Sequence, residues 1–79
     1  MTKAEIKNLI IKSDYKNKDV VIWWKYNDIT SVAIYNDNDD GFYLDYNDIA
    51  YELDDLVDVI FWVSSNCNLK LKILEVDNV

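Results

Sequence analysis

Apolar and polar residues alternate along the middle of the chain in a way that predicts three consecutive β-strands. Residues 20–26 are β-branched or aromatic, residues 30–35 place Val and Ile on one face with Ala and Tyr on the other, and residues 42–46 direct Phe, Leu and Tyr inward. Asn27-Asp28 and the polar segment 36–41 separate these strands, and both contain residues that tolerate the backbone of tight turns. The pattern therefore predicts a three-stranded antiparallel meander.

A helix is expected before this meander. Thr2 and Glu5 have the spacing of a capping box, in which each side chain accepts a hydrogen bond from the other residue's backbone amide. Apolar residues then recur at Ile6, Leu9 and Ile10, which is helical spacing. We expect the helix over residues 3–13.

The segment 48–65 fits a second helix, with Asp48 as its N-cap and acidic residues in its first turns, where the helix dipole favours them. Its apolar stripe comprises Ile49, Leu53, Leu56, Val57, Ile60 and Ser64. The alternative is a shorter helix followed by a strand at 57–63, because those residues also have strong β propensity. Residues 69–76 begin with clean alternation and predict a final strand. The expected fold is a small single α+β domain of order αβββαβ, with helices packed on an antiparallel sheet.

The exposure of two adjacent tryptophans depends on which faces of the sheet the helices cover. Trp23 and Trp24 point to opposite faces of the sheet because successive strand residues alternate. Helices on different sides would cover both rings. Helices on one side would leave one ring exposed, with Tyr35, Tyr43 and Val21 nearby.

Charge is distributed unevenly along the sequence. The net charge is -7, yet residues 26–69 contain ten acidic residues and no Lys or Arg, whereas residues 1–25 carry six Lys against three acids. An acidic surface without interspersed lysine either is simply solvated or mimics the phosphates of a nucleic acid. The candidate partner-binding residues are Asp37, Asp39, Asp40, Asp45, Glu52, Asp54, Asp55 and Asp58.

The chain lacks the residue types that most catalytic, metal and phosphate-binding sites need. The chain has no His and no Arg, a single Gly and a single Cys, Cys67, so we expect no catalytic site, no metal and no cofactor. The segment 36–47 has a superficial likeness to a calcium loop, but position 12 is Asn47, where a bidentate Glu is needed. The pI near 4.2 argues against direct binding to nucleic acid or to anionic membranes. With neither a signal-peptide pattern nor a membrane-length apolar run, we expect a cytoplasmic protein.

The first helix with its Lys-Asn-Lys-Asp connection at 16–19, the polar loop 36–41 and the acidic helix beginning near Asp48 form a layout that resembles a known family. It is similar to the small acidic phage-encoded anti-CRISPR proteins, which block type II effector nucleases as DNA mimics. In that family the acidic surface occupies the site that reads the DNA motif next to the target. The C-terminal strand 69–76 departs from the best-known member, which continues in helix.

We therefore expect a phage-type inhibitor that binds a basic, nucleic-acid-handling host protein and blocks its nucleic-acid site. One alternative is an immunity or antitoxin-like protein that neutralises a basic nuclease toxin. Another is a non-catalytic interaction domain that uses an aromatic sheet face, with a homodimer through an edge strand as one form of it.

Overall fold

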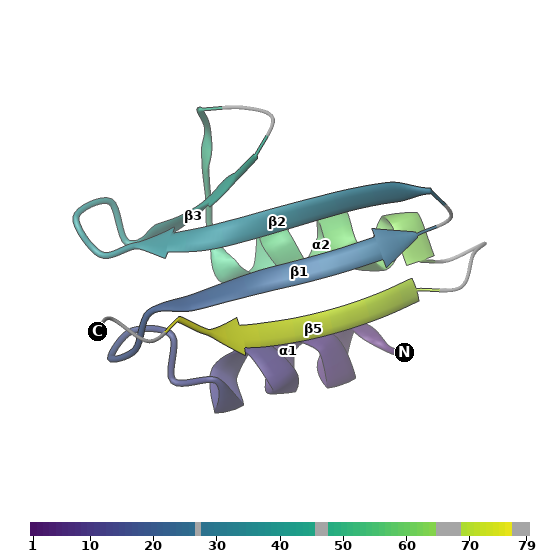
Figure 1. Cartoon of the computed structure of the whole chain (residues 1–79), viewed down its shortest axis with the longest axis horizontal. Helices are drawn as coiled ribbons and strands as arrows, with labels where there is room; N and C mark the ends of the chain where they lie inside the picture. The colour runs from purple at the N-terminus through teal and green to yellow at the C-terminus, as the bar shows by residue number, and fades with distance from the viewer. Residues whose placement is uncertain (27, 46–47, 65–68, 77–79) are drawn as a thin grey trace.

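The computed structural model describes residues 1–26, 28–45, 48–64 and 69–76. In chain order the elements are α1 (Lys3–Lys12), β1 (Val20–Tyr26), β2 (Ile29–Asn36), β3 (Gly41–Leu44), β4 (Ala50–Tyr51), α2 (Leu53–Ser64) and β5 (Leu69–Glu75). Five strands form one antiparallel sheet in the order β4-β3-β2-β1-β5 (Figure 1). The predicted α+β fold class and its order of elements are confirmed.

The capping box at the start of α1 is present. The backbone amide of Glu5 donates to Thr2 Oγ1 at 3.1 Å, and the backbone amide of Thr2 donates to Glu5 Oε1 at 3.0 Å. These bonds satisfy amides that have no partner within the helix and hold the pKa of Glu5 below its ordinary value, the backbone hydrogen bond being the main cause. The helix ends at Lys12 with Ser13 as its C-cap, and Asp14 then adopts a left-handed backbone with φ 58° that turns the chain toward β1.

Both helices pack against the same face of the sheet. In Figure 1 α1 lies behind β5 and α2 lies behind β1 and β2, so the opposite face of the sheet looks toward the viewer. The core between the helices and the sheet consists of Ile6, Ile10, Ile22, Trp24, Ala33, Phe42, Leu44, Leu56, Val57 and Ile60. The two helices also contact each other, which brings the Lys-bearing α1 beside the acidic α2.

Helix α2 begins later than its sequence pattern suggested. Residues 50–51 pair with the outer edge of β3 as β4, in the register Phe42↔Tyr51 and Tyr43↔Ala50. The sheet therefore takes the backbone hydrogen bonds of this segment, and the first helical bond comes later, from the Leu56 amide to the Glu52 carbonyl at 2.9 Å. The prediction of a start at Asp48 is wrong.

Within the predicted apolar stripe, Ile49 is exposed and lies outside the helix. The other option for this segment, a strand at 57–63, is also wrong. Leu56, Val57 and Ile60 are all buried against the sheet, and only helical spacing puts these three on one side of the chain.

Because both helices lie on one side, the two adjacent tryptophans have different environments. Trp24 is buried beneath the helices, whereas Trp23 pairs with Val32 on the opposite face and is half-buried there. Tyr43 lies on the same side as Trp23, as expected. Tyr35 does not, because strand alternation places it on the helix face, where its ring lies 4.8 Å from that of Tyr15.

Neither helix in the described parts of the chain has the length and apolar character needed to cross a membrane.

Candidate acidic interaction surface

The fold brings two acidic segments to one end of the molecule. The β2–β3 turn supplies Asp37, Asp39 and Asp40, and the first turn of α2 supplies acids that follow directly on β4. Asp40, Glu52 and Asp54 line the same hollow, together with Lys7 and Lys16. Segments separated by more than ten residues in the sequence therefore contribute carboxylates to one surface, which we call the acidic end.

Tyrosine hydroxyls and the backbone fix the shape of the β2–β3 turn. Asp40 has a left-handed backbone with φ 48°, and Asn36 accepts a hydrogen bond from the backbone amide of Asn38 at 2.9 Å. The Tyr35 hydroxyl donates to the Asp40 carboxylate, and the Tyr43 hydroxyl donates to the Asp39 carboxylate. The turn acids are thus held in place by tyrosines on the adjoining strands.

These hydrogen bonds shift the titration of their partners. The bond from Tyr35 is the main cause that holds the pKa of Asp40 below its ordinary value, and the charge of Lys16 adds to it. The same bond, reinforced by partial burial, raises the pKa of Tyr35 to about 12. The bond to Asp39 raises the pKa of Tyr43. Each tyrosine keeps its proton because that proton is shared with a carboxylate.

We expect Tyr35 to titrate later than the ordinary tyrosines of the chain. Its folded pKa lies above the unfolded value of roughly 10, so the stabilisation is complete below that pH and is lost as the pH rises toward about 12. In an ultraviolet titration of the folded protein, Tyr35→Phe should remove the part of the tyrosinate signal that appears at the highest pH. Asp40→Asn should move that part to lower pH. An unchanged high-pH signal in Tyr35→Phe would contradict the assignment.

Lysines of α1 and the following loop reach into the acidic end. Lys7 Nζ lies 2.8 Å from Asp54 Oδ1, Lys3 Nζ lies 2.9 Å from Asp58 Oδ1, and Lys16 Nζ lies 3.8 Å from Asp40 Oδ1. The Lys7 side chain is 42% exposed and the other five are more than half exposed, so each pair contributes little to stability. They do change the electrostatic potential of the surface, since each lysine offsets the charge of one carboxylate. Residues 26–69 contain no lysine, but the fold brings lysines from outside this segment next to its acids.

Among the residues that the structure describes, the charges of other candidate acids are not offset by a lysine partner. Within the described parts of the chain, no lysine forms an ion pair with Asp37, Asp45, Glu52 or Asp55. Glu52 and Asp55 lie at the start of α2, where the positive end of the helix dipole favours them. Asp45 is separate from the others, because it follows the end of β3 that lies away from the β2–β3 turn. Its backbone amide donates a hydrogen bond to the carbonyl of Val32.

One neighbour of these acids was not among the predicted site residues. Trp62 is 81% exposed on α2, and it follows Asp55 by seven residues and Asp58 by four, so all three lie on one side of the helix. The sequence does give a sign that Trp62 is exposed, because this residue falls outside the apolar stripe of the helix. A large exposed aromatic beside carboxylates is typical of protein-binding surfaces.

The described residues hold no group of His, Cys, Asp and Glu suited to a metal ion. In the calcium-like segment, Asn36 and the acids Asp39 and Asp40 accept hydrogen bonds from within the hairpin itself. The segment's last position, Asn47, lies outside the described residues, as does Cys67.

The chain matches no family model, no curated protein and no solved structure.

Proposed function

We propose that this protein is a non-catalytic inhibitor that binds a basic, nucleic-acid-handling protein of its host through the acidic end and blocks that protein's nucleic-acid site. The observation that carries the proposal is the convergence of the β2–β3 turn and the start of α2, represented by Asp40, Glu52 and Asp54 in one hollow. The resemblance to small phage-encoded anti-CRISPR proteins makes a CRISPR effector nuclease one target of this class. The place of action would be the host cytoplasm.

The spacing of the unpaired acids supports this mechanism. Glu52 and Asp55 are three residues apart on or just before α2, and a helix rises about 1.5 Å per residue, so they are separated by about 4.5 Å along the axis. A nucleic-acid strand carries one charge per roughly 3.4 Å. Asp54 and Asp58 contribute less to the negative potential of the surface, because Lys7 and Lys3 offset their charges. The acids that no lysine offsets are therefore Glu52 and Asp55 at the start of α2, with Asp37 in the β2–β3 turn.

The experiment is a pull-down from host lysate with the full chain as bait, washed at low and then at high salt. Opposed charged surfaces are screened within about 8–10 Å at ordinary ionic strength, so the specific partner should leave at high salt. It should also be displaced by double-stranded DNA, because the acidic end and the DNA would compete for one basic site. Partners that resist both salt and DNA, or the absence of any basic nucleic-acid-binding protein, would refute the proposal.

A further inference from the structure

The two edges of the sheet differ in length. β4 forms one edge and comprises only Ala50–Tyr51, whereas β5 forms the other and runs over Leu69–Glu75. A short edge strand offers little to another chain, but a long one presents a row of backbone donors and acceptors. In the part of the chain that the structure describes, no strand pairs with the outer side of β5. β5 is therefore the edge with room for a further strand.

The hydrogen-bond pattern identifies which residues of β5 direct their backbone to this free edge. The Val76 amide donates to the Asp19 carbonyl at 2.8 Å. Bonded and non-bonded pairs alternate along an antiparallel ladder, so the backbone of Lys72 also points toward β1. The backbone groups of Leu71 and Ile73 point the other way, to the free edge. The side chains of these two residues face the helix layer, where they pack against the core and stay half-buried.

A groove runs beside this edge, between β5 and α1. In Figure 1 α1 lies behind β5 and extends below its free edge, so a strand added there packs on the helix instead of facing water on that side. Leu9, Leu71 and Ile73 give the groove its apolar part, and Leu9 is 41% exposed. The volume of about 410 Å³ lies in the range of pockets that hold small ligands. The groove therefore has space for alternate side chains of an added strand.

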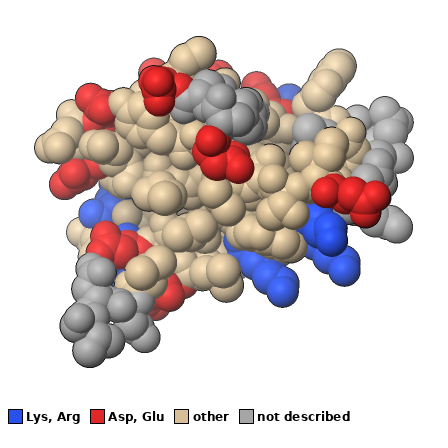
Figure 2. All heavy atoms as spheres, turned by 45° about the horizontal axis from the view of Figure 1, so that its top comes forward, with Lys and Arg blue, Asp and Glu red and all other residues tan. Residues whose placement is uncertain are grey.

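Lysines without a carboxylate partner are concentrated around β5. Of the eight lysines, Lys3, Lys7 and Lys16 form the ion pairs of the acidic end. Figure 2 shows Lys side chains grouped at the lower right, the end of the view at which β5 begins in Figure 1. Among the described residues, no carboxylate forms an ion pair with the remaining lysines, which are Lys12, Lys18, Lys25, Lys70 and Lys72.

These five lysines border the free edge on both sides. Strand alternation directs Lys70 and Lys72 to the face opposite the helices, where Lys25 is the register partner of Lys70. On the helix side Lys12 and Lys18 line the groove. A segment that adds to β5 therefore meets positive charge on each of its two faces.

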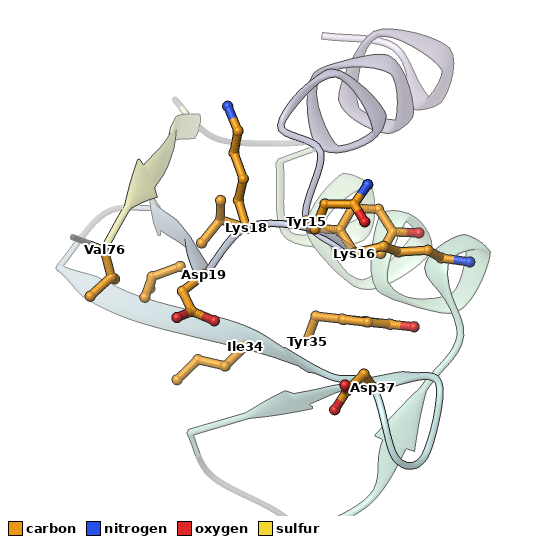
Figure 3. Close-up of a pocket in the computed structure, with 11 residues that line it drawn as sticks. Tyr15, Lys16, Lys18, Asp19, Ile34, Tyr35, Asp37 and Val76 are labelled. Atoms are coloured by element: carbon orange, nitrogen blue, oxygen red, sulfur yellow. The ribbon is translucent and has the colours of Figure 1, made fainter. Parts of the chain in front are cut away.

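The acids closest to the groove leave most of this charge in place. Lys18 also lines a second pocket, which contains Asp37, but Figure 3 shows the Lys18 side chain pointing away from Asp37. Glu75 is the one carboxylate among the residues that line the groove, and it stands at the end of β5. The part of the edge suited to acidic residues is therefore 69–73.

We propose that the free edge of β5 binds an extended acidic segment of a partner protein as a sixth strand of the sheet. Alternate apolar residues of that segment pack in the groove against Leu9, Leu71 and Ile73, and the acidic residues between them face Lys70 and Lys72. Backbone hydrogen bonds supply affinity in this mode of recognition, and alternate side chains supply specificity. The occupant is thus defined by a pattern in which apolar and acidic residues alternate.

Two other occupants suit the edge less well. A second copy paired through its own β5 brings Lys70 and Lys72 of the two chains together, and like charges on neighbouring strands are destabilising. A nucleic acid has neither a strand backbone nor apolar side chains to fill the groove, and the net charge of -7 repels it. The lysines therefore disfavour self-pairing while they favour an acidic strand.

Fluorescence anisotropy with a labelled peptide tests the proposal. The probe is Val-Glu-Val-Glu-Val-Glu-Val, which has the length of β5 and the proposed alternation. It should bind the full chain, and the same peptide with Lys in place of Glu should not. A wild-type protein that does not bind the Glu peptide, or that binds both peptides equally, would overturn the proposal.

Two pairs of variants locate the site of binding. Lys70→Gln/Lys72→Gln should raise the dissociation constant of the Glu peptide about tenfold, because two exposed ion pairs are lost. Its control, Lys3→Gln/Lys7→Gln, removes the same charge elsewhere and should leave the peptide's affinity unchanged. In the groove, Leu9→Ser should weaken binding several-fold, roughly the effect of losing one apolar contact. The control Ile11→Ser alters a residue of the same helix that does not line the groove. Equal losses within either pair would contradict binding at this edge.

Amide hydrogen exchange followed by nuclear magnetic resonance separates strand addition from simple charge attraction. With the peptide bound, the amides of Leu71 and Ile73 should exchange at least about tenfold more slowly, whereas those of Lys70 and Lys72 already bond β1 and should change little. Binding without this protection would refute the proposal. The same protection at high protein concentration without peptide would instead identify a second copy as the occupant. The edge shares no residue with the acidic end, so these outcomes do not decide the proposed function.

Discussion

Replacing Ile10 with alanine is expected to lower the free energy of unfolding by about 2–5 kcal/mol. Ile10 has no exposed surface and lies in the core between α1 and the sheet. Removing its outer carbons loses buried apolar area and leaves a cavity that the packed helices can fill only in part. Chemical denaturation of the purified protein, followed by far-ultraviolet circular dichroism, measures the change.

The neighbouring residue provides the control. Ile11 is in the same helix and 51% exposed, so Ile11→Ala should change the free energy of unfolding by no more than about 0.5 kcal/mol. A domain of this size has a total stability of about 5 kcal/mol, and Ile10→Ala alone could remove most of it. Ile10→Val, with an expected loss of about 0.5–1.5 kcal/mol, keeps the comparison measurable. Equal losses at positions 10 and 11 would contradict the packing of α1.

The strands of the meander could be predicted because their signal is local. Residues 20–26 are assigned as a strand both by pattern and by structure, and the alternation of Phe42 and Leu44 correctly placed both side chains in the core. The capping box of Thr2 and Glu5 is equally local, since both partners lie within one turn. Here the chemistry of a few neighbouring residues decides the structure.

The start of α2 could not be found in the same way. Residues 48–52 have an acceptable N-cap and an apolar Ile49 at helical spacing, yet Ala50 and Tyr51 join the sheet. The deciding factor is the free edge of β3, which offers hydrogen bonds to whichever segment folds back along it. That edge exists only after the meander has formed, so no local pattern reports it.

The candidate site shows the same division. The sequence identifies its acids, and the absence of lysine between residues 26 and 69 suggested an undiluted negative surface. Lys7 and Lys3 nevertheless pair with Asp54 and Asp58, because α1 and α2 pack side by side. Which carboxylates keep their charge depends on tertiary packing and could not be predicted from the order of residues.

If the acidic end binds a basic target, neutralising its unpaired acids should weaken the complex strongly. For the variant Asp37→Asn/Glu52→Gln/Asp55→Asn we expect a roughly 100-fold higher dissociation constant, which corresponds to about 1 kcal/mol for each carboxylate. None of these three forms an ion pair with a lysine in the described parts of the chain, so the fold should be retained, and only the small stabilisation of Glu52 and Asp55 by the helix dipole is lost. Isothermal titration against the captured target measures the change.

Two further variants separate local charge from net charge. Asp28→Asn/Asp45→Asn/Glu75→Gln removes the same number of charges from exposed residues outside the β2–β3 turn and α2, and it should change the affinity much less. Lys3→Gln/Lys7→Gln removes the lysines that offset Asp58 and Asp54, and it should strengthen binding. A target that responds to net charge alone would be weakened equally by the two triple variants. A phosphate-mimicking surface requires that affinity falls when its acids are neutralised and rises when the lysines that offset them are removed. Both effects should be confined to the acidic end, where carboxylates substitute for the phosphates of a nucleic acid, and both should shrink at high salt.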